Sequence, residues 1–470
     1  MIGQFLHVVK KTRMATDYNK ELFKYAVYYP VVFLRRQPVA LYLKKLLDSQ
    51  YMSDDELEVL QVHKLRKLIK YAKEEIPYYK EKVSDVSENE ICNIDDLSYM
   101  PHVTKKMIQE HPGEFIGKKS PLFLTKKTTG GSTGEPVTVY KDHDAMAHEL
   151  AATWRGYSWA GIDIGDRQGR FWGVPFASKD KLRAKLIDCV TNRKRCSAFS
   201  FDDKSLEGYT KMLTEFNPTY FYGYVSMLEE YAKYFERICK KPPFNLRCVI
   251  TTSEVLTDYH RKLIEDVFTA PVFNEYGSGE LGSVAHECED GSLHVMAENM
   301  IVEVFDGERK CRPGEMGELV ITELNNRAMP LIKYRTGDFA ALSPQKCRCG
   351  RTLPVIENLA GRAYDIVVNR AGKLFHGEFF VYIFEEAKRS NLGVNAFQVQ
   401  QITYDHIHIK VVPGYQYGGN TENYIKNKIQ QGINSNTRVT IEKVESIERE
   451  PSGKMRVVVG MDNVIRSNSG

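Results

Sequence analysis

The sequence has no apolar run long enough to cross a membrane. Its most apolar stretch, Tyr25–Leu34, has ten residues, contains Pro30 and is followed directly by two arginines. A spanning helix needs about 20 predominantly apolar residues, so we expect no transmembrane span. The amphipathic pattern continues through Leu41–Leu47. Packing of this region on the main domain is the first expectation, and peripheral membrane contact is the alternative.

The sequence also lacks a strong excess of charge. Its 65 Lys and Arg residues against 61 Asp and Glu residues give a formal net charge of +4. No basic block is interleaved with aromatics, so we expect no nucleic-acid partner. The nine cysteines are an odd number spread over 470 residues, and the N-terminus MIGQFLHVVKKTR lacks the features of a signal peptide. We therefore expect a reducing, cytoplasmic compartment; the chain is either a monomer or a homodimer.

What is present is the composition of a soluble globular protein, with 42% hydrophobic and 27% charged residues over a length that predicts two or three domains. Strands alternate with helices in the central part, as at 169–175 (GRFWGVP) and 248–254 (CVITTSE), which predicts an α/β fold with parallel strands. From Leu293 onward the segments are shorter and richer in strand, so we expect a β subdomain. The expected domains are an N-terminal helical segment at 1–80, a large α/β domain at 81–360 and a small α+β domain at 361–470.

One stretch between two predicted strands, Lys127–Tyr140 (KTTGGSTGEPVTVY), has the chemistry of a polyphosphate site. Glycine lets the backbone approach a ligand, successive N–H groups form an anion site, and hydroxyls add donors. Beside Lys127, these residues are Thr128, Thr129, Gly130, Gly131, Ser132, Thr133 and Gly134. The loop leads into a β-branched, alternating segment, whereas a Walker loop leads into a helix. A flexible surface loop is the alternative interpretation.

Further motifs follow this loop along the chain. They are TTSE at 251–254, NEYGSGE at 274–280, YRTGD at 334–338, GRAYD at 361–365 and PSGKMR at 451–456. With the loop, this ordered set resembles the adenylate-forming ligases and is most similar to their phenylacetate–CoA ligase branch, including relatives in capsule and cell-surface polysaccharide clusters. LRKLIKYAKEEIPYYKE at 65–81 resembles the N-terminal part of that branch. The resemblance implies a large α/β domain with a β subdomain and a small, mobile C-terminal domain.

The resemblance implies a role for each motif. Tyr276 lies on the adenine, Glu280 reaches Mg²⁺, and Lys454 bridges the substrate carboxylate and the α-phosphate of ATP. Asp338 binds the ribose, a role that suits an ionised carboxylate because it accepts two hydrogen bonds from a vicinal diol. The other implied nucleotide-binding residues are Ser253, Glu254, Glu275, Gly277 and Arg362, together with the loop residues.

The resemblance also implies an acyl pocket. Its lining residues are Trp172, Gly173, Tyr222, Gly223, Tyr224, Glu275 and Tyr276. Aromatic side chains there suit a flat or apolar acid, but the sequence does not choose among an aryl acid, a fatty acid and an amino acid. Two positions depart from the family pattern: Tyr364 stands where the hinge motif often has an acid, and Gly279 where relatives often have Ser or Thr.

The chemistry implied by the resemblance is ATP-dependent formation of an acyl-adenylate, followed by transfer of the acyl group to coenzyme A after the small domain rotates. Positioning and charge neutralisation do most of the catalytic work in such a reaction. The alternative acceptor is an amine or hydroxyl in surface-polysaccharide assembly. An inactive scaffold is a third hypothesis, and the presence of the loop, Glu280, Asp338 and Lys454 argues against it.

Four soft ligands in two clusters predict a structural Zn²⁺ site. Cys347 and Cys349 form a C-x-C pair, and Cys288 and His294 form a pair upstream. The C-x-C spacing is tighter than the usual zinc spacing, and free cysteine is also a common core residue, so simple packing is the alternative. His286 is the alternative nitrogen ligand.

Overall fold

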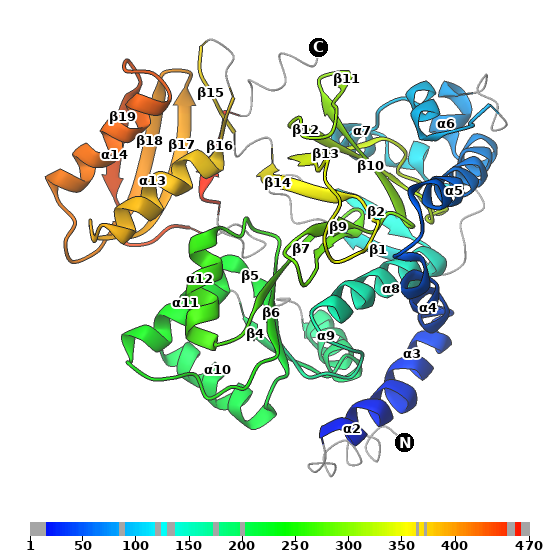
Figure 1. The fold of residues 1–470 in the computed structure, drawn as a ribbon, viewed down its shortest axis with the longest axis horizontal. Coiled ribbons are helices and arrows are strands. Elements are labelled where there is room, and N and C mark those ends of the chain that lie inside the picture. Colours follow the sequence, from blue (N-terminus) through cyan, green and yellow to red (C-terminus); the bar gives the residue numbers. More distant parts are fainter. Residues whose placement is uncertain are drawn as a thin grey trace.

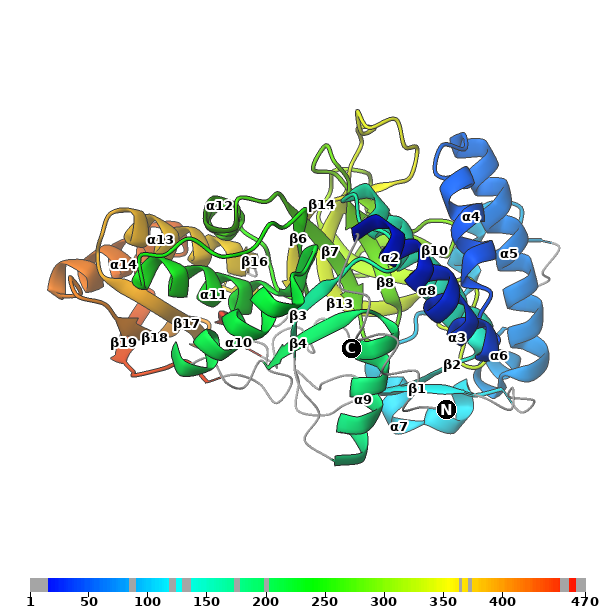
Figure 2. The ribbon, with the colours of Figure 1, turned by 90° about the horizontal axis from the view of Figure 1, so that it is seen from below.

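The structure, a computed structural model, describes residues 16–83, 90–117, 124–128, 137–172, 178–197, 203–362, 366–370, 374–448 and 456–461. Figure 1 shows helices near the N-terminus, a large sheet with helices around it, and a small C-terminal unit. In both Figure 1 and Figure 2, the C-terminal unit and the helices α4 (Val39–Ser49) and α5 (Asp54–Glu75) lie at opposite ends of the molecule.

A sheet of twelve strands forms the central part, in the order β11-β10-β12-β13-β14-β9-β8-β7-β6-β5-β3-β4. The parallel half consists of β3 (Gln168–Trp172), β4 (Arg193–Ser197), β5 (Tyr220–Tyr224), β6 (Cys248–Thr252) and β7 (Val272–Ser278). The antiparallel half consists of β8 (Gly282–Glu287), β9 (Leu293–Val295), β10 (Met300–Asp306), β11 (Arg309–Lys310), β12 (Gly317–Glu323), β13 (Tyr334–Leu342) and β14 (Val355–Arg362). Strand β7 joins the two halves, because it pairs parallel with β6 and antiparallel with β8. The predicted parallel α/β part is confirmed, and the β-rich segments after Leu293 extend the same sheet.

Helices cover both faces of the parallel half, because side chains at alternate strand positions point to opposite faces. Phe171 and Phe221 lie in the core on one face, whereas Tyr220 and Tyr222 lie in the core on the other. The helices of the first face are α10 (Asp203–Phe216), α11 (Val225–Arg237) and α12 (Asp258–Phe268). The second face packs against α8 (His143–Trp159). Helix α9 (Ser178–Val190) precedes the edge strand β4.

The described part of the predicted N-terminal segment, residues 16–80, is helical, and short helices continue beyond it to Phe115. Besides α4 and α5, these helices are α2 (Thr16–Phe23), a π-helical η1 (Lys24–Tyr28), α3 (Tyr29–Leu34), α6 (Pro77–Lys82), η2 (Ile94–Tyr99), α7 (Lys105–Glu110) and η3 (Pro112–Phe115). Ser53 begins α5 with a capping box to Glu56. The helix ends just before Pro77, which has no backbone N–H to continue it and which begins α6. The IPYYKE segment therefore ends the long helix and forms a short helix of its own.

The apolar run Tyr25–Leu34 is divided between burial and exposure. Tyr28 is buried and accepts a hydrogen bond from Trp154 Nε1 (2.7 Å), whereas Phe33 and Leu34 are 77% and 81% exposed. One side of this run therefore packs on the main body, and membrane contact by the other side stays a prediction. None of the helices in the described part of the chain is both long and apolar enough to cross a membrane.

The C-terminal unit has its own sheet, with strand order β19-β18-β17-β20. Its elements are β15 (Ile366–Val368), β16 (Leu374–His376), α13 (Gly377–Arg389), β17 (Val394–Thr403), β18 (His406–Pro413), α14 (Gly419–Gly432), β19 (Arg438–Lys443) and β20 (Val458–Val459). Phe380, Phe384, Ile407 and Ile409 belong to a core that is separate from the cores of the large sheet. The unit therefore has the α+β composition that alternating strands and amphipathic helices predict.

Candidate active site and metal centre

Several of the predicted residues lie outside the described part of the chain. They are Thr129, Gly130, Gly131, Ser132, Thr133, Gly134, Gly173, Tyr364 and Lys454. The stems of the phosphate loop are described as an antiparallel hairpin of β1 (Thr125–Thr128) and β2 (Thr138–Lys141), with Thr128 paired to Thr138. Arg362 ends β14 at the register position opposite Asp338 of β13.

The nucleotide motifs converge near β7 and β13. Tyr276 Oη donates a hydrogen bond to Asp338 Oδ2 (2.8 Å), so residues 62 positions apart meet. Tyr334 Oη donates to Glu280 Oε1 (3.4 Å). Glu280 is buried, and among the described residues Tyr334 is its hydrogen-bond partner. The residues expected at the adenine, the ribose and Mg²⁺ therefore lie in one region.

Three further predicted residues shape the backbone at the ends of β5, β6 and β7. Ser253 has a φ of +68°, in the left-handed region. Glu254 accepts hydrogen bonds from the Ser226 backbone N–H (2.6 Å) and Oγ (3.0 Å) at the start of α11, so its carboxylate is already engaged. A Cβ on Gly277 would lie 2.8 Å from Gly282 O, so β7 and β8 approach this closely only with glycine there.

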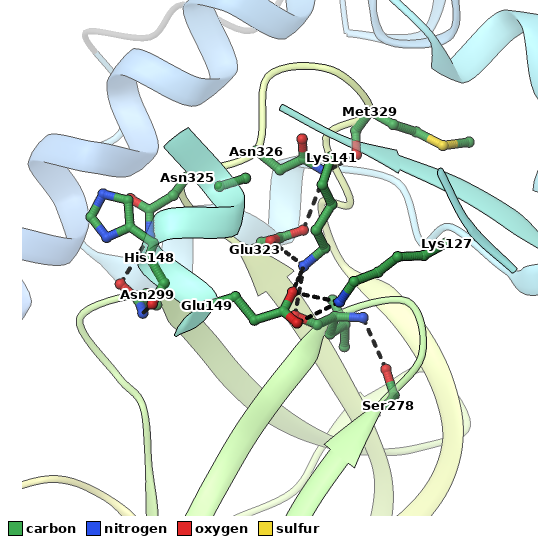
Figure 3. Close-up of polar contacts among 12 residues, drawn as sticks. Lys127, Lys141, His148, Glu149, Ser278, Asn299, Glu323, Asn325, Asn326 and Met329 are labelled. Carbon is green, nitrogen blue, oxygen red and sulfur yellow. Dashed lines mark hydrogen bonds and ion pairs between the residues drawn. The ribbon is translucent and has the colours of Figure 1, made fainter. Parts of the chain in front are cut away.

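A network of two lysines and two glutamates, two of them buried and two half-buried, joins the stems of the phosphate loop (Figure 3). Lys127 Nζ donates to both carboxylate oxygens of Glu149 (2.5 and 2.6 Å). Lys141 Nζ lies 3.1 Å from Glu149 Oε2 and 2.7 Å from Glu323 Oε1. Burial opposes ionisation of Glu149, but the two lysines outweigh it and hold its pKa at about 2. We name these residues the stem quartet: Lys127 on β1, Lys141 on β2, Glu149 on α8 and Glu323 on β12.

The stem quartet also holds the turn that carries Glu280. Lys141 Nζ donates to the Leu281 carbonyl (2.7 Å), and Leu281 N donates to Ser278 Oγ (3.0 Å; Figure 3). Gly282 has a φ of +86°, and a Cβ there would lie 2.3 Å from Glu149 Cδ. The loop stems and the proposed metal ligand are therefore fixed to one another through Glu149 and Lys141.

Sequence reasoning noted only Lys127 of this quartet. The other three residues belong to stretches without a motif. One signal was available: Lys141 continues the inward positions of Val137 and Val139 in an alternating strand, and a lysine at a core position needs a buried partner.

The predicted acyl-pocket aromatics gather at the ends of β3 and β5. The ring centroids of Trp172 and Tyr224 lie 4.3 Å apart, and those of Trp172 and Tyr222 lie 5.7 Å apart. A Cβ on Gly223 would lie 2.5 Å from Phe171 Cβ. Gly223 therefore offers only its backbone to this cluster, because its side-chain position is filled by the core of the opposite face.

Two ionisable groups lie among these aromatics. The Arg170 guanidinium carbon lies 4.6 Å from the Trp172 ring centroid and 4.5 Å from that of Tyr222. Glu275 accepts a hydrogen bond from Tyr157 Oη (3.4 Å). Burial raises the pKa of Glu275 to about 7, although the charge of Arg170 opposes this change. Sequence reasoning missed Arg170, whose signal was a charge inside the strand GRFW.

The four predicted zinc ligands form a cluster. One ligand atom from each of Cys288, His294, Cys347 and Cys349 lies within 4.8 Å of the others. His294 Nε2 lies 3.2 Å from Cys349 Sγ, while His294 Nδ1 lies 3.0 Å from the Leu353 carbonyl. A backbone carbonyl that accepts the Nδ1 proton orients an imidazole so that its Nε2 can bind a metal. The alternative ligand His286 lies elsewhere: its Nε2 lies 2.5 Å from Ser283 Oγ.

Comparison with known proteins identifies the family. Residues 45–326 match the family described as AMP-binding enzyme, and residues 367–461 match the CapK C-terminal domain. The chain is 25% identical over 442 residues to Protein CapK of Staphylococcus aureus, covering 91% of this chain and 94% of that protein. It is 26% identical over 351 residues to a phenylacetate-coenzyme A ligase of Escherichia coli, covering 70% and 77%.

Solved structures support the same fold. A 2-hydroxyisobutyryl-CoA ligase in its postadenylation state has a TM-score of 0.70 at 19% identity, covering 89% of this chain and 93% of that one. The amide bond synthetase McbA from Marinactinospora thermotolerans has a TM-score of 0.53 at 16% identity, covering 75% and 71%. The fold is that of the adenylate-forming ligases, and because the family match spans more than half of its residues, the chain belongs to the AMP-binding enzyme family.

Proposed function

We propose that the chain is an AMP-forming ligase that activates a carboxylic acid with ATP and then transfers the acyl group to coenzyme A. The observation that carries this proposal is that Tyr276, Asp338 and Glu280 lie in one region, next to the hairpin of the phosphate loop, whose Lys141 donates a hydrogen bond to the turn after Glu280. The similarity to phenylacetate-coenzyme A ligases supports coenzyme A as the acceptor. ATP and coenzyme A are cytoplasmic metabolites, so we place the reaction in that compartment.

Each group contributes binding or charge rather than a covalent bond. Tyr276 contacts the adenine and Asp338 accepts hydrogen bonds from the ribose hydroxyls. Thr128–Gly134 binds the β- and γ-phosphates through its backbone N–H groups and hydroxyls. Glu280 fits a Mg²⁺ ligand, since Tyr334 is the one described residue that engages its carboxylate. When bound, Mg²⁺ offsets the charge of the phosphates.

Lys454 stabilises the charge that develops between the substrate carboxylate and the α-phosphate. A lysine suits this position because it is a compact charge on a long stem. Arg362, the last residue of β14 in the large sheet, contacts the ribose or a phosphate.

The decisive experiment is a screen for pyrophosphate release across a library of carboxylic acids, run with and without coenzyme A. The expected result is acid-dependent release, with an acyl-adenylate that is consumed when coenzyme A is added. An acyl-adenylate that ignores coenzyme A and disappears only with an amine or alcohol would contradict the thiol acceptor. Absence of acid-dependent release across the library would contradict the proposed reaction.

We also propose that Cys288, His294, Cys347 and Cys349 hold a structural Zn²⁺. The donor set of three thiolates and one imidazole, with His294 oriented by Leu353, suits a tetrahedral zinc ion. The site joins β8 and β9 to the loop before β14, so the metal would fix the antiparallel half of the sheet. Metal analysis of the purified chain should find about one zinc ion per chain; a metal-free chain with an unchanged melting curve would contradict the proposal.

A further inference from the structure

Three arginines gather on one face at the edge of the parallel sheet. Arg170 of β3 pairs in register with Arg195 of β4 and with Tyr222 of β5, and Arg193 lies two positions before Arg195. Since paired residues and residues two positions apart share a face, all three arginines lie on the face of Tyr222. This is the face of the predicted acyl pocket.

The positive charge of this cluster is only partly compensated. Asp188 of α9 forms ion pairs with both Arg193 and Arg195, the second at 2.8 Å. Arg170 has no ion pair with any described carboxylate, and its buried Nε has no hydrogen-bond partner among the described residues. Burial, with the charge of Arg170 added, lowers the pKa of Arg193 to about 10, which is the response expected of crowded cations.

The aromatic rings position the Arg170 guanidinium but do not accept hydrogen bonds from its N–H groups. Its guanidinium lies against Trp172 and Tyr222, which attract a cation through their ring faces but accept no in-plane hydrogen bond. A guanidinium presents N–H donors in a planar fork that matches a carboxylate. The site therefore offers a fixed, charged donor beside the aromatic cluster.

Glu275 complements this donor rather than neutralising it. It does not approach Arg170 closely enough for an ion pair, and it accepts a hydrogen bond from Tyr157 instead. Because burial raises its pKa to about 7, its carboxyl is protonated in part of the molecules at neutral pH, and in that form it can itself donate a hydrogen bond. A ligand anion would accept hydrogen bonds from both residues. A ligand ammonium would be repelled by Arg170, and a purely apolar acyl chain would remove water from the guanidinium without replacing its hydrogen bonds.

We propose that the acid activated by this chain carries a second anionic group, which Arg170 binds, so that the substrate class is a dicarboxylic acid or another dianionic acid. Arg193 and Arg195 set the positive field around it, and Trp172 and Tyr222 position the guanidinium. The proposal rests on the proposed adenylation, because it concerns the acid that is activated, and it names the class of that acid.

The experiment compares matched pairs of acids by pyrophosphate release: glutarate with pentanoate, isophthalate with benzoate, and alanine with propanoate as the ammonium arm. Coenzyme A is omitted from these assays, because its phosphate groups are anions that could bind to Arg170 in place of the second acidic group of the substrate. We expect kcat/KM for each diacid to exceed that of its matched monoacid by about tenfold or more. We expect alanine to be used no better than propanoate.

Arg170→Met should remove this preference through a higher KM for the diacid, so that kcat/KM for each diacid falls to or below that of its matched monoacid, while the KM for ATP changes by about twofold or less. Arg170→Lys, which keeps the charge but not the fork, should retain an intermediate preference. Arg237→Met is the matched control, because it removes an arginine that is 44% exposed on α11, and it should keep the full preference.

Two outcomes overturn the proposal while leaving the adenylation intact: monoacids used as well as diacids by the wild type, or a diacid preference that survives Arg170→Met. Should Arg170→Met fail to fold, the wild-type preference and the Arg170→Lys variant decide the question in the same way. Failure of every acid to release pyrophosphate overturns the proposed function itself, and this inference with it.

Discussion

The two sides of the proposed site differ in how their charges are paired. On the nucleotide side, the stem quartet pairs every charge with one of opposite sign, whereas on the acyl side the arginine cluster does not. The stem quartet has two positive and two negative groups, and each of them has a partner of opposite sign within 3.1 Å. The arginine cluster has three positive groups, of which Arg193 and Arg195 share one carboxylate and Arg170 has none among the described residues. A neutral, fully paired network fixes backbone segments, whereas an unpaired cation is available for a ligand. The comparison therefore predicts that substitutions in the quartet change stability and that substitutions of Arg170 change specificity.

The largest effect is expected for Lys141→Met. The lysine is fully buried and pairs with Glu149 and Glu323, so its removal leaves the buried Glu323 without a cationic partner and leaves Glu149 with Lys127 alone. Removing one partner of a buried pair costs about 3–5 kcal/mol. Urea denaturation measures the loss, and Arg170→Met provides the comparison, with an expected change of about 1 kcal/mol or less. Equal losses of unfolding free energy in Lys141→Met and Arg170→Met would contradict the proposal that the quartet serves stability and Arg170 serves specificity.

The next largest effect concerns rate rather than stability. Lys454→Ala should lower acid-dependent pyrophosphate release by about 10²–10³, with an unchanged melting curve and with a supplied acyl-adenylate still consumed. Lys443→Ala is a suitable control, because Lys443 is 58% exposed on β19. Unchanged pyrophosphate release in Lys454→Ala would remove this lysine from the catalytic role.

A smaller effect is expected at the metal cluster. Cys347→Ser, or treatment with a chelator, should lower the melting temperature by several degrees, corresponding to about 2 kcal/mol. Pyrophosphate release at permissive temperature should change much less. Cys239→Ser is the matched control, since Cys239 is an exposed cysteine outside the cluster. A parallel loss in both variants would show that thiol substitution, and not metal loss, lowers the stability.

The smallest effect is expected for Glu275→Gln, which should change how the folding stability depends on pH. Below pH 4.5, the ordinary pKa of a glutamate, Glu275 is protonated in both the folded and the unfolded chain, so it does not contribute to the pH dependence of stability. Between 4.5 and its raised pKa of about 7, only the unfolded chain releases the proton, so this group makes stability fall as pH rises. Above about pH 7 the penalty is constant.

Glu275→Gln should therefore be stabilised relative to wild type by a few degrees more at pH 8 than at pH 5, as melting curves can measure. The groups that act on Glu275 are Arg170, Tyr157, Tyr222 and Glu149, and His286 lies opposite it in β8. Tyr157→Phe is the control, because it removes the hydrogen bond while keeping the carboxyl. A difference that does not change with pH would contradict a raised pKa.

Much of the fold could be predicted from the sequence because it depends on local periodicity. The parallel strands around GRFW and CVITT, the long helix ending at Pro77 and the α+β order of the last 100 or so residues all follow from patterns of 2.0 and 3.6 residues. The continuity of the twelve-stranded sheet could not be predicted in this way, because strand pairing across β7 and β8 depends on contacts that no local pattern encodes.

The residues of the candidate site also fall into those that a local sequence pattern indicates and those that only contacts between distant segments reveal. Tyr276, Asp338 and Glu280 could be proposed from the sequence because each lies in a short motif, and the structure places the three residues in one region. Lys141, Glu149 and Glu323 could not be predicted, because their function is to contact one another across 182 positions of sequence. The proposed zinc ligands fall between these cases: their residue types predicted a metal site, and the structure showed that they lie close together.

The sequence by itself determined the family, the order of the nucleotide motifs and the residue types of the metal cluster, since these are properties of short segments. Only the tertiary structure decided which buried charges are paired. Pairing depends on distances of about 3–4 Å between side chains, and such distances arise when β1, β2, α8 and β12 pack together. Arg170 illustrates the difference: in the sequence it is one charge in a strand, and in the structure it is a cation beside two aromatic rings that has no ion pair with any carboxylate among the described residues.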